Sequence, residues 1–118
     1  MRRFVVEADG GSRGNPGPAA YGAVVLDAVS GEVVAELADY VGETTNNVAE
    51  YSGLIAGLAE CARIDPSATV DVRMDSKLVI EQMSGRWQVK NPSMRDLVKR
   101  AHAYETREGS KAAWARLT

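Results

Sequence analysis

The stretch Phe-Val-Val-Glu-Ala-Asp at positions 4–9, followed directly by Gly10 and Gly11, sets the fold of this chain. An apolar run that ends in an acid and a glycine pair is typical of a sheet strand that stops where α/β folds place their sites. A second run, Val-Asp-Val-Arg-Met-Asp at positions 70–75, repeats the arrangement. We therefore expect Asp9 and Asp75 to lie at the carboxyl ends of two strands in one sheet.

A third acid, Glu50, falls in the segment Thr-Thr-Asn-Asn-Val-Ala-Glu at positions 44–50, in the first turn of an expected amphipathic helix. Acids at two strand ends and one helix start can converge at the crest of an α/β sheet. Carboxylate oxygens are hard ligands that suit magnesium or manganese. The three acids together therefore predict a metal site.

Each acid also has a structural explanation. Asn47 as N-cap with Glu50 three residues later resembles a capping box, and an acid there favours the helix dipole. Asp9 before two glycines is compatible with a simple turn, and Asp75 with a helix start at Ser76. These three explanations are independent of one another, whereas a metal site accounts for all three acids at once.

Four other side chains leave their roles open. Glu7 shares a strand face with Asp9 but lies one layer deeper, where a salt bridge is the expected role. His102 falls in the middle of a helix among basic residues and is expected at the surface. Trp87 suits either a core anchor or a stacking surface for a sugar-phosphate chain. Cys61, on the helix that carries Glu50, is expected to be a small core hydrophobe.

Composition limits the class of protein. The 118 residues, 45% of them hydrophobic, predict one globular domain spanning 1–118. The single cysteine excludes an internal disulfide and a cysteine-based zinc site, and a reducing cytoplasm is the simplest location. No apolar run approaches a membrane span of roughly 20 residues, and no signal-peptide pattern follows Met1.

The charges are unevenly spread. The net charge of −2 argues against a protein that holds nucleic acid by bulk positive charge. Residues 86–107 nevertheless contain six basic residues against two acids, Asp96 and Glu105. The basic residues are Arg86, Lys90, Arg95, Lys99, Arg100 and Arg107. Such a stretch suits either a solvated helix face or a track for phosphates.

Periodicity and turn residues predict eight elements. Strands are expected at 3–8, 20–28, 32–41, 69–74 and 112–117, helices at 47–63, 76–84 and 94–107, and a shaped loop at 10–18. The order β-β-β-α-β-α-α-β predicts an α/β fold, a mixed five-stranded sheet with helices packed on it. In the first helix the predicted apolar face consists of Val48, Tyr51, Ile55, Leu58 and Ala62. Gly53 and Gly57 lie on another face, and we expect them to let the helix backbone approach the sheet.

Three motifs in sequence order now resemble a known family. They are residues 9–18 with Tyr21-Gly22 behind them, residues 45–51, and residues 74–79 with Trp87 behind them. The chain resembles ribonuclease H type 1 over nearly its whole length, and most of all the short bacterial forms such as those of actinobacteria. The resemblance implies a ribonuclease H-like fold.

The resemblance also implies an activity. Family members are endonucleases that cut the RNA strand of an RNA–DNA hybrid with two divalent ions, Mg²⁺ or Mn²⁺, leaving a 3′-hydroxyl and a 5′-phosphate. Asp9 resembles the acid that bridges both ions, with Glu50 and Asp75 as its partners on either side. Such a clamp lowers the pKa of a bound water and neutralises charge on the attacked phosphate.

Substrate contacts follow from the same motifs. Asn15, Thr45, Asn46 and Asn47 resemble groups that touch sugar 2′-hydroxyls and backbone, the contacts able to separate RNA from DNA. Lys77, Trp87 and Lys90 resemble contacts to the phosphates of the DNA strand, which position a duplex without reading its sequence. Gly10, Gly11 and Ser76 fall within the motifs and complete the expected substrate-binding set.

The chain departs from the family pattern in two places. Residues 88–92 leave no room for the helix of a basic protrusion, so hybrid affinity is expected to be modest. The fourth acid of the family, at the start of a C-terminal helix, and the histidine before it have no counterpart up to Thr118. We therefore expect a C-terminally truncated domain with weakened activity, and a last strand able to pair with another chain as a dimer. The alternatives are a catalytically incompetent nucleic-acid-binding or fragment domain, and a phosphoryl-transfer enzyme with another substrate.

Overall fold

The computed structural model describes residues 2–105 and 111–116, which form a mixed five-stranded sheet with helices on one face. The elements are β1 (Arg3–Ser12), β2 (Gly17–Asp27), β3 (Val33–Thr44), α1 (Asn46–Ile64), β4 (Thr69–Met74), α2 (Lys77–Met83), α3 (Pro92–Glu105) and β5 (Lys111–Arg116). The strand order is β3-β2-β1-β4-β5, with β1 to β3 antiparallel and β1, β4 and β5 parallel. The predicted element order β-β-β-α-β-α-α-β and the predicted mixed five-stranded sheet are confirmed. No described helix is long and apolar enough to cross a membrane.

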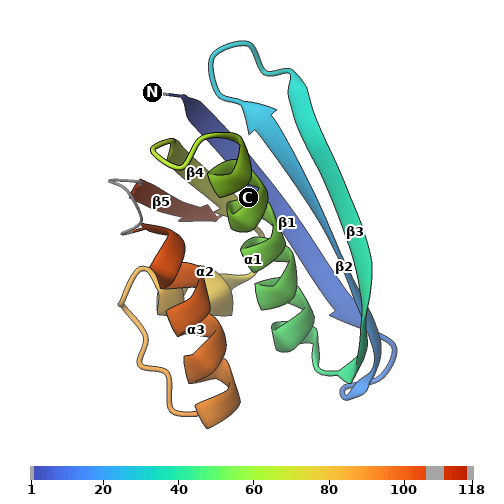
Figure 1. Ribbon diagram of the computed structural model, residues 1–118. Coiled ribbons are helices and arrows are strands. Elements are labelled where there is room, and N and C mark those ends of the chain that lie inside the picture. The colour runs from blue at the N-terminus through green and yellow to red at the C-terminus, as the bar shows by residue number, and fades with distance from the viewer. Residues whose placement is uncertain (1, 106–110, 117–118) are drawn as a thin grey trace.

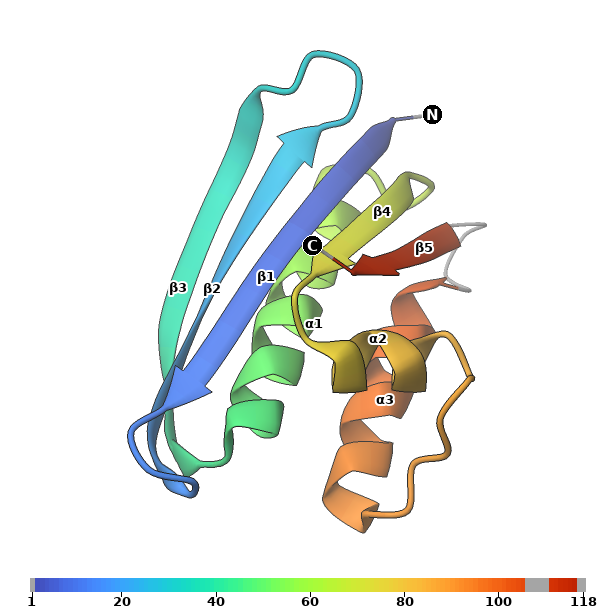
Figure 2. The ribbon, with the colours of Figure 1, turned by 180° about the vertical axis from the view of Figure 1, so that it is seen from behind.

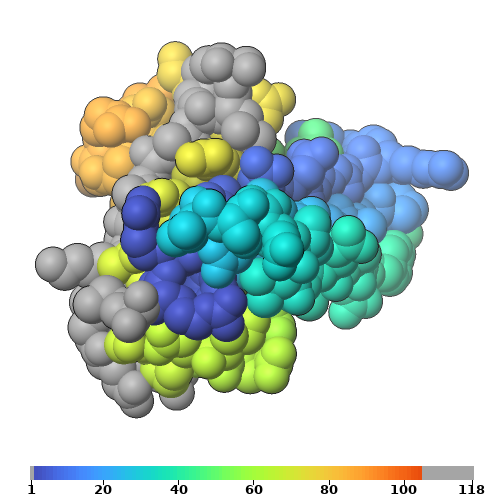
Figure 3. Space-filling view, turned by 90° about the horizontal axis from the view of Figure 1, so that it is seen from above, coloured from blue at the N-terminus to red at the C-terminus, as the bar shows by residue number. Residues whose placement is uncertain are grey.

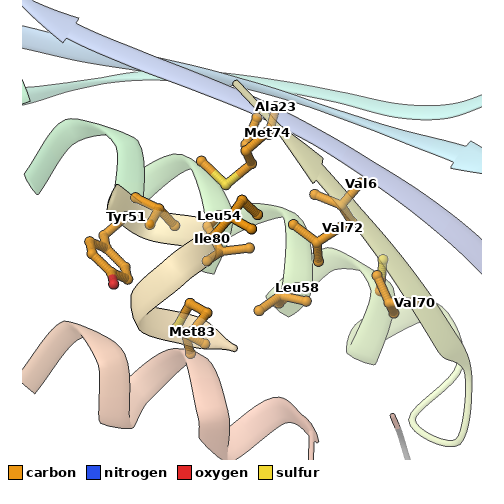
Figure 4. Packing of buried hydrophobic residues seen from close by; sticks show 14 of the residues in the cluster. Val6, Ala23, Tyr51, Leu54, Leu58, Val70, Val72, Met74, Ile80 and Met83 are labelled. Carbon is orange, nitrogen blue, oxygen red and sulfur yellow. The ribbon is translucent and has the colours of Figure 1, made fainter. Parts of the chain in front are cut away.

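The core lies between the sheet and α1, because one side-chain set of β1 faces that helix. Phe4, Val6 and Ala8 are buried there, as the alternation of a strand requires. Figure 4 shows Val6 and Val72 from the strands meeting Leu54 and Leu58 of α1. Full burial of an aliphatic side chain of this size stabilises a fold by about 1.5–3 kcal/mol. Cys61 belongs to the same buried cluster, as expected.

The opposite face of β1, β2 and β3 carries no described helix. Figure 2 shows β1 from this side, with α1 behind the sheet. Asp9 and Glu7 belong to the side-chain set of β1 that points to this face, because they alternate with Val6 and Ala8. The open face is therefore the surface on which Asp9 stands.

The expected loop at 10–18 is wrong at both ends. β1 continues to Ser12 and β2 begins at Gly17, with Gly10 paired to Tyr21 and Ser12 to Ala19. Only residues 13–16 connect the two strands. The glycines therefore serve a strand interior rather than a loop, because glycine in a strand permits close approach of another backbone.

The start of α1 also differs from the prediction. Thr45 is the N-cap, its side chain accepting a hydrogen bond from the Val48 amide at 3.3 Å, so Asn47 lies inside the helix. The first turn contains no acid, which places Glu50 beyond it. The capping-box explanation of Glu50 is therefore wrong.

The buried face of α1 is centred on its two glycines rather than on a face away from them. Gly53 and Gly57 are buried with Tyr51, Leu54, Leu58 and Cys61, whereas Val48, Ile55 and Ala62 are half-buried. A Cβ on Gly57 would lie 2.5 Å from Cγ1 of Val6, so the helix touches β1 with its backbone. The close approach is confirmed, and of the predicted apolar face Tyr51 and Leu58 are in the core while Val48 and Ile55 pack against it; the prediction is wrong in placing the glycines on another face. The amphipathic pattern misleads because glycine carries no hydrophobic side chain.

The remaining bounds differ by one to three residues, the largest difference being the end of β3 at Thr44 rather than residue 41. Ser76 caps α2, as predicted, and accepts a hydrogen bond from the Val79 amide at 3.2 Å. α3 begins at Pro92 rather than residue 94, and the predicted last turn at 106–107 lies outside the described residues. β5 covers Lys111–Arg116, one residue earlier than expected, and position 117 also lies outside them.

Candidate metal centre and nucleic-acid surface

Asp9 lies within β1, three residues before its end, so the predicted strand end is wrong there, whereas Asp75 directly follows β4, as predicted. The parallel register pairs Glu7 with Arg73, and Asp9 and Asp75 stand two residues further along each chain. Both carboxylates are exposed, whereas Glu50 is half-buried on α1. The sequence prediction that two strands and one helix bring these acids to one end of the sheet is therefore consistent with their positions.

Gly10 sets the distance between β1 and the helix that carries Glu50. A Cβ on Gly10 would lie 2.4 Å from the carbonyl carbon of Ala49 and 2.6 Å from the amide nitrogen of Glu50. Only glycine therefore lets the backbone next to Asp9 rest against the backbone next to Glu50. Gly10, predicted as a substrate contact, has a packing role that positions two acids.

The environment of Glu50 links the three acids electrostatically. Burial raises the pKa of the Glu50 carboxyl, and the negative charges of Asp9 and Asp75 raise it further. A hydrogen bond with the Ser76 side chain acts in the opposite direction and lowers the pKa. Glu50 thus lies within the field of both aspartates and is held by the residue that follows Asp75.

Carboxylate oxygens suit a hard divalent ion, but the side chains of Asp9, Glu50 and Asp75 do not converge on one point. Among the described residues, no three His, Cys, Asp or Glu side chains are grouped closely enough to hold a metal ion. Oδ1 of Asp9 accepts a hydrogen bond from the Gly10 amide at 2.9 Å. The side chains of Asp9 and Asp75 are exposed. They would have to rotate for the three carboxylates to bind one ion together.

Asn15 and Asn46 form a clamp between the β1–β2 turn and the start of α1. The backbone N–H of Ser12 donates to Oδ1 of Asn46 at 2.7 Å, and the backbone N–H of Asn46 donates to Oδ1 of Asn15 at 3.1 Å. The Ser12 hydroxyl also lies 2.8 Å from Oδ1 of Asn46. The carbonyl oxygens of both asparagine side chains are therefore engaged within the protein.

The other residues predicted at the helix start divide into two kinds. The Thr45 side chain caps α1, which is a structural role, while the Asn47 side chain is exposed. Gly11 faces open space, because an added Cβ would meet only Oδ1 of Asn46 at 4.0 Å. Asn47 and Gly11 are thus accessible to a ligand beside the acids.

Trp87 and Lys77 form an exposed pair next to Asp75. Trp87 is 41% exposed, which excludes the core-anchor alternative. The Nζ atom of Lys77 lies 5.5 Å from the centre of the Trp87 ring, within the range of a cation–π contact. Lys90, in the segment before α3, is exposed. Arg86 is a weaker candidate for phosphate, because its Nε lies 2.6 Å from Oε2 of Glu81.

Two of the open roles receive an answer. Glu7 is half-buried on the open face of β1, and no ion pair of Glu7 occurs within the described residues, so the expected salt bridge is wrong. It lines an open cleft of about 670 Å³ with Asp9 and Glu36. His102 is half-buried on α3 rather than fully at the surface.

Two contacts near the acids were missed by the sequence reasoning. Ser12 holds Asn46 across 34 residues, and the Tyr51 hydroxyl donates to Oε1 of Gln82 at 2.8 Å, joining α1 to α2. Local sequence carries no signal for such pairs, because each joins residues far apart in the chain.

Comparisons with known proteins agree with this fold. A family described as reverse transcriptase-like matches residues 7–112, the span that contains all three acids. The chain is similar to the N-terminal RNase H domain of a Mycobacterium tuberculosis protein, with a TM-score of 0.92 and 49% identity, covering 99% of this chain and 83% of that one. RNase H1 from Halobacterium salinarum gives a TM-score of 0.85 at 40% identity, covering 98% and 83%. LC11-RNase H1, solved in complex with an RNA/DNA hybrid, gives 0.85 at 35% identity, covering 97% and 84%.

Among curated sequences, a bifunctional protein of Mycobacterium tuberculosis is 56% identical over 101 residues, which are 86% of this chain and 28% of that protein. Ribonuclease HI of Halobacterium salinarum is 46% identical over 101 residues, 86% of this chain and 49% of that enzyme. The chain thus spans less than half the length of these two curated relatives. With its fold, its acids and these relatives taken together, the chain belongs to the reverse transcriptase-like family of ribonuclease H domains.

Proposed function

We propose that this chain hydrolyses the RNA strand of RNA–DNA hybrids at the site formed by Asp9, Glu50 and Asp75. The observation that carries the proposal is the position of Glu50, half-buried and within the field of both aspartates. The charges of Asp9 and Asp75 oppose ionisation of Glu50, and a bound cation would offset that repulsion. Family members named ribonuclease H, and the hybrid complex of one of them, point to the substrate.

The proposal includes two divalent ions, Mg²⁺ or Mn²⁺. Asp9 would hold both ions, with Glu50 and Asp75 on either side. Such ions supply a nucleophilic water and neutralise charge on the phosphate and the leaving oxygen, giving a 3′-hydroxyl and a 5′-phosphate. Mg²⁺ demands near-ideal octahedral geometry. Because the acids are not closed around one point, we expect low activity that is higher in manganese.

The other residues of the site have separate tasks in this proposal. Ser76 orients the Glu50 carboxylate through its hydroxyl. The clamp of Asn15 and Asn46 fixes the β1–β2 turn beside the acids, and the exposed amide of Asn47 is free to contact the RNA strand. Lys77 and Trp87 form a cationic and aromatic surface for the backbone of the DNA strand. Contacts of this last kind position a duplex without reading its sequence.

The test is cleavage of end-labelled duplexes of one sequence. The RNA–DNA hybrid, duplex RNA, duplex DNA and single-stranded RNA are each incubated with Mg²⁺, Mn²⁺ or EDTA. We expect cleavage of the RNA strand of the hybrid alone, only with a metal ion, and a 5′-phosphate on the downstream product. Cleavage in EDTA, or of duplex DNA in preference to the hybrid, would contradict the proposal.

A binding domain without catalytic competence is the second candidate, and one observation favours it. The described acids do not form a group of three close enough to hold a metal ion. Hybrid binding without cleavage in either metal, together with no Mn²⁺ binding by calorimetry, would support this candidate. Saturable Mn²⁺ binding that is lost in Asp9→Asn would contradict it.

A further inference from the structure

A groove on the open face of the sheet lies beside the acids and shares only Gly11 and Ser12 with the site described above. It is open, has a volume of about 500 Å³, and is lined by residues of β1, the β1–β2 turn, β2 and β3. Gly11 and Ala20 belong to its lining, together with the side chains of Arg13 and Tyr40. We call it the turn groove.

The strand register places the turn groove next to Asp9. Gly11 pairs with Ala20, and Ala20 pairs with Tyr40, so these three residues form one row across the sheet. The neighbouring row joins Asp9, Gly22 and Ala38. Two residues along a strand span about 7 Å and return to the same face. A strand of nucleic acid leaving Asp9 in this direction would therefore reach the turn groove within one nucleotide.

The charges around the groove indicate a short ligand rather than a long one. Residues 14–62 contain no Lys or Arg, and two of the acids in that stretch, Glu36 and Glu43, lie on β3 on either side of Tyr40. Arg13 is thus the one cation at this end of β1, β2 and β3 among the described residues. A run of phosphates along β3 would meet Glu36 and Glu43, whereas a single phosphate can lie at Arg13.

Tyr40 supplies the second half of a nucleotide site. Its side chain is 62% exposed, which is unusual for a large aromatic residue in a strand. Exposed aromatic rings next to cations are the means by which proteins hold single-stranded nucleic acid, because every base offers a face for stacking. The floor of glycine and alanine leaves room above the sheet for a base.

We propose that the turn groove holds an unpaired nucleotide of the RNA strand, next to the paired hybrid segment. The base stacks on Tyr40 and its phosphate contacts Arg13. This inference rests on the proposed function, because the paired segment is placed by the acids.

The experiment compares the Kd of a blunt hybrid with that of hybrids carrying a three-nucleotide extension. Four extended hybrids are used, with the extension on the 5′ or 3′ end of the RNA strand or of the DNA strand. All proteins carry Glu50→Gln to prevent cleavage, and fluorescence anisotropy gives the Kd. The quantity compared is the ratio of the blunt Kd to the extended Kd for each protein.

We expect one RNA extension to bind at least about fivefold more tightly than the blunt hybrid, the lower range for stacking of one base. Tyr40→Phe should keep the ratio, while Tyr40→Thr, which keeps strand propensity but has no ring, should reduce it to about one. Arg13→Gln should reduce it as well. Val33→Thr, exposed on the same strand, and Arg63→Gln, a cation at the far end of α1, are matched controls that should leave the ratio unchanged.

A Kd ratio of one for both RNA extensions would overturn the inference. Tighter binding of an extended hybrid that persists in Tyr40→Thr and Arg13→Gln would overturn it as well. A gain confined to the DNA extensions would overturn the assignment to the RNA strand. Cleavage by the unmodified protein separates the two proposals. A retained ratio without any cleavage contradicts only the proposed function, and normal cleavage with a ratio of one contradicts only the turn groove.

Discussion

At the scale of single residues, Asp9 is the side chain on which the proposed chemistry depends most. We expect Asp9→Asn to abolish cleavage while leaving the fold and hybrid binding nearly intact. Its carboxylate is exposed, so little packing is lost, but the amide cannot supply the charge that holds the ions. Single-turnover cleavage and thermal melting measure the two effects. Substantial turnover in this variant would show that the ions are held elsewhere, with Glu7 the first suspect.

Glu50 gives a prediction about stability and pH. Its pKa is raised above the usual 4.5, so the folded state binds this proton more tightly than the unfolded state. The resulting stabilisation is complete below about pH 4.5 and is lost as pH rises through the raised pKa. In EDTA at pH 7.5 we therefore expect Glu50→Gln to melt at a higher temperature than the unmodified protein.

The melting temperatures of these two proteins should converge as pH falls toward 4.5. Added Mg²⁺ or Mn²⁺ should also narrow the gap at pH 7.5, by stabilising only the protein with the carboxylate. A gap that is the same at both pH values would contradict the assignment of the raised pKa to Glu50.

The two asparagines at the start of α1 are expected to have different roles, Asn46 in stability and Asn47 in hybrid binding. Asn46→Ala removes acceptors for Ser12, and each lost neutral hydrogen bond costs about 0.5–1.5 kcal/mol. Asn46→Asp keeps the acceptor oxygen and should melt close to the unmodified protein. Asn47→Ala should leave the melting temperature unchanged and raise KM for the hybrid, because Thr45 is the cap. A large fall in stability for Asn47→Ala without a change in KM would contradict this division.

At this scale the sequence indicated the three acids but not how they are held. Asp9, Glu50 and Asp75 stand in recognisable motifs, but β1 continues past Asp9 and Glu50 lies beyond the first turn of α1, so the local patterns placed only Asp75 correctly. The Ser12–Asn46 contact and the Ser76–Glu50 contact join distant segments, so only the folded chain reveals them.

At the scale of elements, the contact between β1 and α1 controls the spacing of Asp9 and Glu50. Gly10→Ala would force a Cβ to within 2.4 Å of the Ala49 backbone, so the helix or the strand must move. Overpacking of this kind typically costs about 1–3 kcal/mol and occasionally more. We expect a lower melting temperature and a loss of cleavage larger than the unfolded fraction explains. Gly11→Ala, whose Cβ meets only open space, is the matched control for stability.

The same contact explains where element prediction failed. Residues 10–12 look like loop because glycine-rich stretches usually are, yet here the glycines let a strand run under a helix. On α1 the pattern of large apolar residues pointed away from Gly53 and Gly57, which are in fact the points of closest approach. The other elements were predicted to within three residues of the described bounds, because capping serines, prolines and strand alternation act locally.

At the scale of the whole molecule, the charges divide the protein into two parts. Figure 3 shows β1 to β3 in blue to cyan on one side and α3 in orange on the other. The first part together with α1 contains the stretch 14–62, which has acids but no Lys or Arg, and the rest of the chain carries most of the cations, including Lys77 and Lys90. A duplex approaching the acids is therefore expected to lie toward α2 and α3.

This division predicts the salt dependence of hybrid binding. Each phosphate contact that is removed should reduce the slope of log K against log salt by about 0.9 for a B-form duplex. We expect Lys77→Gln and Lys90→Gln each to lower the slope by roughly that amount. Arg86→Gln should change it less, because Glu81 already pairs with the guanidinium. Equal effects for all three substitutions would show that the ion pair opens when the duplex binds.

All four lysines of the chain, at positions 77, 90, 99 and 111, lie in its second half, and none lies on β1, β2 or β3. Acylation of side-chain amines will therefore modify the surface proposed for the duplex and spare the face of β1, β2 and β3. Coupling the protein to a sensor through its amines would bury that surface against the matrix and hide its affinity. Conversely, the degree to which bound hybrid shields each lysine from acetylation would map the duplex on the protein, one amine at a time.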